Sequence, residues 1–139
     1  MKSFIACAIA TSAYASAAIR ANKVCVENMG GYDLNWWVDD LITGNQSANS
    51  GSYPIDQDRC NTIVITDLSE GDFLEVYVHA VAGVTKSADT AIIYQTTPAV
   101  TATYTCRGTT LNFQCTLNGE LYVNELLAAG LEVPEDLLL

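Results

Sequence analysis

Residues 74–80 read Leu-Glu-Val-Tyr-Val-His-Ala, and this stretch decides the fold class of the chain. Its aliphatic side chains stand at every second position, from Leu74 through Val76 and Val78 to Ala80, with Glu, Tyr and His between them. Successive side chains of a strand point to opposite faces of a sheet. The stretch therefore predicts a β-strand with one buried face and one outer face.

Further runs on both sides of this stretch have the same period of two, at residues 24–27, 34–39, 62–65, 90–95, 100–106 and 111–117. They are rich in Val, Ile, Thr and Tyr, which fit a pleated surface. Turn-forming Gly, Asn and Ser residues separate them. About seven short strands without intervening helical patterns predict an all-β domain. We expect a two-sheet antiparallel β-sandwich, with a closed barrel as the alternative.

The pattern changes after Gly119. Residues 120–129 permit a helix, and Gly130 is a natural helix stop. The residues that follow are acidic and apolar together. We therefore expect a β domain over residues 16–119 and a short helical or irregular acidic tail over residues 120–139.

The N-terminus has the three parts of a secretory signal peptide. Lys2 supplies the positive charge, residues 4–10 are apolar, and Ala13 and Ala15 are the small residues of a cleavage site. Cleavage after Ala15 is expected, although positions two or three residues later also fit, and a buried N-terminal helix is the alternative. The apolar run is shorter than the about 20 residues of a membrane span. The sequence therefore predicts residues 1–15 as a signal peptide and a secreted, extracellular protein without a membrane span.

The chain is strongly acidic, with a formal net charge of −10. Loss of Lys2 with the signal peptide makes the mature protein one unit more negative. Such a surface repels phosphate backbones and anionic lipid headgroups. Nucleic acids are therefore excluded as partners.

Four cysteines remain after the signal peptide, which contains Cys7. An even number in an exported chain predicts two disulfides, for which three pairings exist. The alternation places Cys25 and Cys60 on outward or peripheral faces and Cys106 and Cys115 on inward faces. This favours Cys25–Cys60 and Cys106–Cys115. The wide spacing of the cysteines argues against the alternative, a zinc site.

Two adjacent tryptophans are the most specific local indication of a binding site in the sequence. Trp36 is in phase with the aliphatic residues of its run and is expected in the core, because adjacent strand residues face opposite ways. Trp37 is left on the outer face with Asn35 and Asp39. An aromatic ring flanked by an amide and a carboxylate suits a sugar ring. The alternative is that the disulfide region, the tail or another subunit covers Trp37, because large aromatic side chains are usually buried.

Three acids, Asp67, Glu70 and Asp72, stand close together in one predicted turn. Calcium prefers six to eight oxygen ligands, so this turn is a candidate calcium site, although its spacing is not that of an EF-hand. A solvated turn without a metal is the alternative, and we expect it. No cofactor is therefore predicted.

The catalytic inventory is thin. His79 is the only histidine, and it lies on the outer face of its predicted strand. No nucleophile motif, metalloprotease motif, phosphate loop or dinucleotide fingerprint accompanies it. We therefore predict that the protein is not an enzyme.

Asn45-Gln46-Ser47 is a sequon for N-glycosylation inside a Gly-, Asn- and Ser-rich loop. We expect Asn45 to carry a glycan.

Several segments carry a resemblance to other proteins. They are Cys-Val-Glu-Asn at residues 25–28, Tyr-Pro-Ile-Asp-Gln at residues 53–57 and Gly-Thr-Thr-Leu at residues 108–111. With these segments the chain resembles an uncharacterised family of small secreted proteins of single-celled eukaryotes, over about residues 24–118. The resemblance implies secretion and a single domain, and it implies no activity.

Three functions follow as hypotheses. The first is a secreted recognition module for an extracellular surface, with carbohydrate as the favoured ligand. The second is a structural or matrix protein that self-associates, which a broad apolar patch joining Trp37 to the tail would favour. The third is a hydrolase centred on His79.

Overall fold

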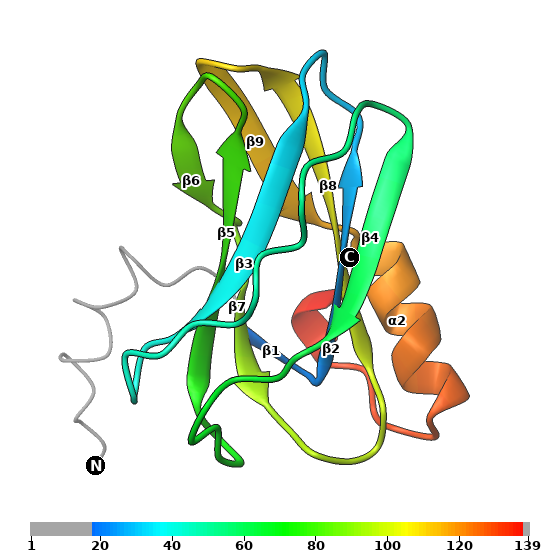
Figure 1. Cartoon of the computed structure of the whole chain (residues 1–139). Coiled ribbons are helices and arrows are strands. Elements are labelled where there is room, and N and C mark those ends of the chain that lie inside the picture. The colour runs from blue at the N-terminus through cyan, green and yellow to red at the C-terminus, as the bar shows by residue number, and fades with distance from the viewer. Residues whose placement is uncertain (1–17, 138–139) are drawn as a thin grey trace, which may run out of the picture.

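The computed structural model describes residues 18–137, and these residues form two β-sheets that face each other, with one helix beside them (Figure 1). The first sheet has the order β1-β7-β5-β3, with β6 also paired to β5, and the second has the order β4-β2-β8-β9. The bounds in the first sheet are β1 (Ala18–Ala21), β3 (Leu34–Asp40), β5 (Phe73–Ala80), β6 (Thr85–Ser87) and β7 (Ala91–Tyr94). The bounds in the second sheet are β2 (Lys23–Asn28), β4 (Gln57–Thr62), β8 (Thr101–Thr109) and β9 (Asn112–Leu117).

The expected two-sheet sandwich is confirmed, but its sheets are mixed and not wholly antiparallel. The N-terminal strand changes sheet at Asn22, so that β1 pairs with β7 and β2 pairs with β8, both in parallel. The Asn22 side chain donates from Nδ2 to the carbonyls of Thr96 and Pro98, and its Oδ1 accepts from the Val100 N–H. These bonds pair backbone groups of the connection between β7 and β8, which lies beside the crossing.

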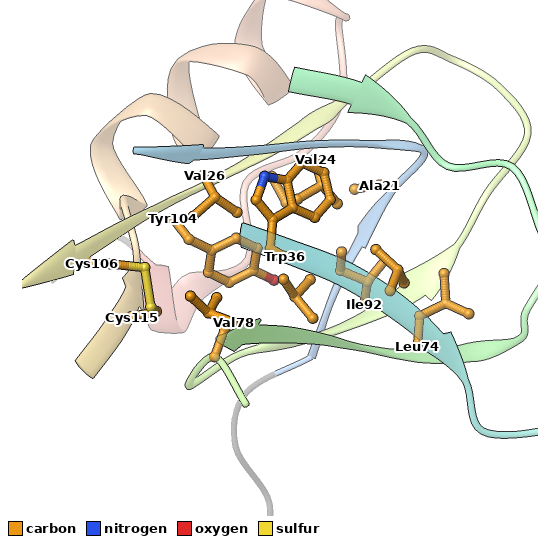
Figure 2. Close-up of a cluster of buried hydrophobic side chains, with 14 of the residues drawn as sticks. Ala21, Val24, Val26, Trp36, Leu74, Val78, Ile92, Tyr104, Cys106 and Cys115 are labelled. Carbon is orange, nitrogen blue, oxygen red and sulfur yellow. A yellow bond between two sulfur atoms is a disulfide. The ribbon is translucent and has the colours of Figure 1, made fainter. Parts of the chain in front are cut away.

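The core fills the space between the sheets, and the alternation predicts its members. From β5 the buried side chains are Leu74, Val76, Val78 and Ala80, as expected. Trp36 is only 2% exposed and extends from β3 toward β2 (Figure 2). The strand assignments 34–39 and 74–80 are therefore correct in both position and phase.

Two buried tyrosines keep their hydroxyl groups hydrogen-bonded. Tyr53 Oη donates to the Val26 carbonyl at 2.6 Å, and Tyr104 Oη donates to the Thr90 carbonyl at 2.7 Å. Both bonds join segments that are distant in the sequence, so the core is held by polar contacts as well as by apolar packing. Burial is the main reason that the pKa of each tyrosine is raised.

One predicted strand is displaced. Residues 62–65 were expected to form a strand, but β4 covers Gln57–Thr62, and its residues are all exposed. β4 pairs with β2 only as far as Lys23, and beyond that point Asn22 leaves for the first sheet. Ile63 makes one last bond to the Asn22 carbonyl and then turns into the core. The alternation was right about which side chains are buried but wrong about the strand, because no partner strand continues there.

The hairpin of β8 and β9 turns later than its glycine suggests. Residues 107–109 lie between the predicted runs 100–106 and 111–117 and were therefore expected to form the turn, but they belong to β8. Gly108 has a φ of 120°, and a Cβ at this position would collide with Asn112 and Phe113 across the hairpin. The glycine is therefore needed for close approach of the paired strands.

Both disulfides join neighbouring antiparallel strands, in the pairing that the alternation favoured. Cys25–Cys60 links β2 to β4, and Cys106–Cys115 links β8 to β9. In each pair the two residues are direct register partners, with a Cα–Cα distance of 4.0 Å. Cys60 is exposed, whereas Cys106 and Cys115 lie at one end of the core (Figure 2).

The tail begins with the expected helix, α2 (Gly119–Ala128), which Asn118 caps by accepting from the Leu121 N–H. Gly130, with a φ of 75°, follows its end. Tyr122 and Leu126 of this helix are buried with the sandwich core. The described part of the chain ends in a short 3-10 helix, η1 (Glu135–Leu137).

Within residues 18–137 no helix is long and apolar enough to cross a membrane. The predicted signal peptide, residues 1–15, lies outside the described residues. Because β1 begins at Ala18, cleavage after Ala15 would leave this strand whole. Two disulfides are consistent with an extracellular protein.

Candidate functional site

The outer face of the first sheet combines residues of two neighbouring strands. β3 presents Asn35, Trp37 and Asp39, and β5 presents His79, Tyr77 and Glu75 opposite them, in that order. We call these six residues the outer face. The sequence had placed each set on the outer side of its own strand. It had not paired them, because local alternation does not indicate which strands become neighbours.

An aromatic pair occupies the middle of the outer face. The rings of Trp37 and Tyr77 are stacked, with centroids 6.0 Å apart and planes inclined by 16°. Both side chains are half-buried, so Trp37 is neither fully covered nor fully free. The Trp37 Nε1–H is itself buried and has no hydrogen-bond partner within the described chain. An unpaired buried donor is costly, and a ligand could remove that cost only if the Trp37 ring shifts to expose the nitrogen.

Two carboxylates lie beside the aromatic pair. Asp39 and Glu75 are direct register partners, so like charges face each other across β3 and β5. Asp39 Oδ1 is buried and, among residues 18–137, accepts no hydrogen bond. The pKa of Tyr77 is raised to about 12. The causes are hydrogen bonding to Glu75, burial and the negative charges of Glu75 and Asp39.

The other end of the outer face is polar and already engaged. Asn35 Oδ1 accepts from Asn49 Nδ2 at 2.9 Å, which fixes the orientation of the Asn35 amide. His79 Nδ1 lies 2.8 Å from Thr85 Oγ1, on the neighbouring strand β6. Both residues are therefore held by neighbours, and the unsatisfied groups of the face are those of Trp37 and Asp39.

Residues 46–53 run along the free edge of β3, and we call them the edge-covering segment. Ser47 Oγ accepts from the Val38 N–H and Ser50 Oγ accepts from the Trp36 N–H, both at 2.9 Å. The serine hydroxyls thus replace the carbonyls of a missing strand and protect an edge that would otherwise invite aggregation. The same contacts hold the backbone on both sides of Trp37.

A polar cleft of about 420 Å³ lies between the edge-covering segment and the end of β4. Side chains of Ser47, Asn49, Ser50, Asn61 and Thr62 line it, together with buried Trp36. Asn49 belongs to the lining of this cleft and also donates to Asn35. The cleft therefore adjoins the polar end of the outer face.

A larger groove of about 510 Å³ lies elsewhere, between β1 and the tail. Its lining is mostly apolar and includes Ile19, Ile93, Leu126 and Leu131, with Arg20 among the polar members. Tyr122 lies in this groove and exchanges hydrogen bonds with the backbone of Arg20. The groove shares no residue with the outer face, and its polar groups show no convergence on one point.

The three acids of the predicted calcium turn have separate partners. Asp67 is exposed, Glu70 Oε1 accepts from the backbone and hydroxyl of Thr96, and Asp72 Oδ2 accepts from the Ser69 N–H. Over residues 18–137 no group of three or more His, Cys, Asp or Glu side chains is placed to hold a metal ion. The turn does not bring these carboxylates together as a calcium site requires.

Asp72 is instead paired with Asp40 at the end of β3. A hydrogen bond with the Asp40 carboxyl is the main cause of the raised pKa of Asp72. Burial opposes ionisation of Asp40, but hydrogen bonds from Asp72, Ile42 and Thr43 lower its pKa on balance. Asp40 Oδ2 has no donor among the described residues while both acids are ionised. Protonation of Asp72 would give this pair of carboxyls a donor, which agrees with the raised pKa of Asp72.

Asp72→Asn is expected to raise the melting temperature near neutral pH and to change it little in acid. Asp72 has a raised folded-state pKa, so its contribution is complete below the ordinary carboxyl pKa and is lost as the pH rises through the folded value. The asparagine amide donates permanently to Asp40, which removes this loss. Melting curves across acidic and neutral pH test the prediction, with Asp67→Asn as the control from the same turn. A variant that melts lower than the wild type at neutral pH would contradict it.

The sequon lies where a loop meets the edge of the first sheet. Asn45 Nδ2 donates to the Thr66 carbonyl at 2.9 Å, and Ser47 is the same hydroxyl that supports Val38. A glycosylated asparagine keeps one N–H on this nitrogen, so the hydrogen bond is compatible with a glycan. Glycosylation of Asn45 stays a prediction.

No protein-family model, curated protein or solved structure matches this chain. Any ligand of the outer face must therefore be inferred from the chemistry of its own side chains. Of the sequence-predicted ligand residues, Trp37 and Asp39 lie together with unsatisfied polar atoms, and Asn35 is held beside them. Tyr77 and Glu75 were not predicted as part of the site, although their phase within residues 74–80 had placed them on an outer face.

Proposed function

We propose that the protein is a secreted, non-catalytic recognition module that binds carbohydrate on its outer face. The observation that carries the proposal is the stacked pair of Trp37 and Tyr77, on the open side of a rigid sheet and beside unpaired hydrogen-bonding atoms. Aromatic rings supply apolar contact area at a low cost in side-chain entropy. A site on a strand is also positioned more rigidly than one on a loop.

A sugar has the two properties that this face requires. Its C–H groups form an apolar surface that stacks on an aromatic ring, and its hydroxyl groups both donate and accept hydrogen bonds. Trp37 Nε1 needs an acceptor and Asp39 Oδ1 needs a donor. A hydroxyl group can satisfy either once a small shift of the side chain exposes the buried atom, whereas a purely apolar ligand would leave both unpaired.

Self-association is the second candidate function. It is supported by a row of exposed apolar residues at one end of the first sheet. Phe73 is 38% exposed and Ile42 is 67% exposed, and the Leu41 N–H donates to the Phe73 carbonyl, so these residues are close together. However, Asp39 and Glu75 lie in register between this row and the aromatic pair. Charges at that place disfavour a continuous apolar interface through Trp37, which favours ligand binding.

A hydrolase centred on His79 has less support. Its Nδ1 is engaged with Thr85, and the carboxylates of the outer face, Asp39 and Glu75, lie two rows away from it, beyond Trp37 and Tyr77. General-base catalysis needs the histidine within hydrogen-bond reach of a nucleophile that meets the substrate. We therefore propose binding without catalysis.

Trp37→Ala is expected to leave the protein folded and to weaken glycan binding by at least tenfold, because a stacked aromatic is commonly a hot spot. A glycan array with the purified mature protein identifies the ligand, and titration of that glycan measures the loss. Leu111→Ala is the control, since Leu111 is 72% exposed at the turn between β8 and β9 of the second sheet and is not part of the outer face. A folded Trp37→Ala variant with full binding, or a wild type that binds no glycan, would refute the proposal.

A further inference from the structure

We infer that the preferred carbohydrate carries free amines, so that an amino-sugar unit places its ammonium group at Asp39 and Glu75 and its ring on Trp37 and Tyr77. The inference rests on the proposed function and names the ligand class of the same face. It follows from three features of that face: its charge, the donor that Asp39 Oδ1 lacks, and the position of its aromatic rings.

The first feature is a charge that the protein leaves uncompensated. Asp39 and Glu75 oppose each other in register, an arrangement that destabilises a sheet. No lysine or arginine belongs to β3 or β5, and His79, the one histidine there, lies two rows away from Glu75 on the far side of Tyr77. Lys86 on β6 is in register with inward-facing Val78, and its Nζ lies 5.7 Å from the Phe113 ring centroid. The repulsion between the two carboxylates is therefore left for a ligand to relieve.

The second feature is a match in hydrogen bonding. A carboxylate only accepts hydrogen bonds, and an ammonium group offers three donors and no acceptor. Asp39 Oδ1 is unpaired within the described chain and is covered, so an ammonium group reaches it only when the Asp39 side chain turns outward. A charged donor forms stronger hydrogen bonds to carboxylates than a neutral hydroxyl does. The face therefore gains more from an amine than from the hydroxyl of a neutral sugar.

The third feature is the position of the aromatic rings. Trp37 and Tyr77 are the next residues in register after Asp39 and Glu75 on the same side of the sheet. A cation near such rings is stabilised by their negative faces, most strongly by tryptophan. A sugar ring stacked here carries its substituents toward the carboxylates one row away. The same side chains thus recognise the ring and its charge.

The second sheet contains a matched pair of acids without these features. Glu27 and Asp58 are also direct register partners, on β2 and β4. Glu27 Oε1 already accepts from the Thr105 hydroxyl, and its row continues to Thr105 and Thr116 and contains no aromatic residue. An opposed carboxylate pair by itself therefore does not indicate an amine site. The outer face differs because its carboxylate pair is combined with unpaired atoms and stacked rings.

The experiment compares two hexasaccharides that differ only in acetylation, glucosamine and N-acetylglucosamine, titrated into the mature protein at one mildly acidic pH and physiological salt. We expect the glucosamine oligomer to bind at least tenfold more tightly. Asp39→Asn with Glu75→Gln should abolish this preference, and Glu27→Gln with Asp58→Asn should leave it unchanged. Trp37→Ala should weaken binding of both oligomers.

Each other outcome overturns a different statement. Equal binding of the two oligomers refutes the amine preference and leaves the carbohydrate proposal standing. A preference that the Glu27 and Asp58 substitutions also remove would assign it to the net charge of the protein. Oligolysine that binds as tightly as the glucosamine oligomer, and equally to the Trp37→Ala variant, would show a general cation site. Binding of neither oligosaccharide, together with an empty glycan array, refutes the proposed function itself.

Discussion

Replacing Trp36 by alanine is expected to lower the free energy of unfolding by about 3–5 kcal/mol, the usual cost of truncating a large buried aromatic residue. Trp36 is 2% exposed and lies between the two sheets, with Val24 and Val26 of β2 and Val78 of β5 among its neighbours in Figure 2. The loss is comparable to the whole stability of many small domains. Secretion of the variant should therefore fall sharply.

Trp37→Ala provides the matched comparison, because it removes the same side chain from the next position of the same strand. Its ring is half-buried and stacks on Tyr77, so the expected loss of stability is only about 1 kcal/mol. Urea denaturation of the two variants measures the difference directly. Equal destabilisation by both substitutions would contradict the assignment of Trp36 to the core and Trp37 to the outer face.

The opposite behaviour of the two tryptophans depends on a property that local sequence does contain. Alternation in residues 34–39 and 74–80 sets which side chains of a strand face inward, because a shift of one residue would expose the whole aliphatic row. The buried positions were predictable for the same reason, including Ile63 and Ile65 outside any strand. β6 escaped prediction because three residues are too few to show a period, and β1 (Ala18–Ala21) also escaped it.

What the sequence did not contain is the neighbourhood of each strand. β1 pairs in parallel with β7 and β2 pairs in parallel with β8, because the chain changes sheet at Asn22. The end of β4 depends on the same residue. Likewise, Tyr77 and Glu75 join the candidate site only because β5 lies beside β3. The acids of the predicted calcium turn also found distant partners, Thr96 and Asp40. These contacts depend on which strands become neighbours and in which register, and local alternation contains no information about either.

The two disulfides depend on local alternation and on long-range packing. Alternation predicts which cysteines pair, whereas the contribution of each disulfide to stability depends on its burial. Chain entropy alone ranks Cys25–Cys60 higher, because its residues are 35 positions apart and those of Cys106–Cys115 only 9. That difference is worth about 1 kcal/mol, on contributions of about 4 and 3 kcal/mol. Burial acts in the opposite direction. Removing two sulfur atoms from the core adds about 2 kcal/mol of lost packing.

Cys106→Ala with Cys115→Ala is therefore expected to destabilise the protein by about 5 kcal/mol, more than the about 4 kcal/mol for Cys25→Ala with Cys60→Ala. Melting of the two double variants gives the ranking. The native protein supplies an independent check, because mild reduction followed by alkylation should label exposed Cys60 and its partner before Cys106 and Cys115. A larger loss from the outer bridge would mean that loop length outweighs burial here. Free thiols in the unreduced secreted protein would refute the two bridges altogether.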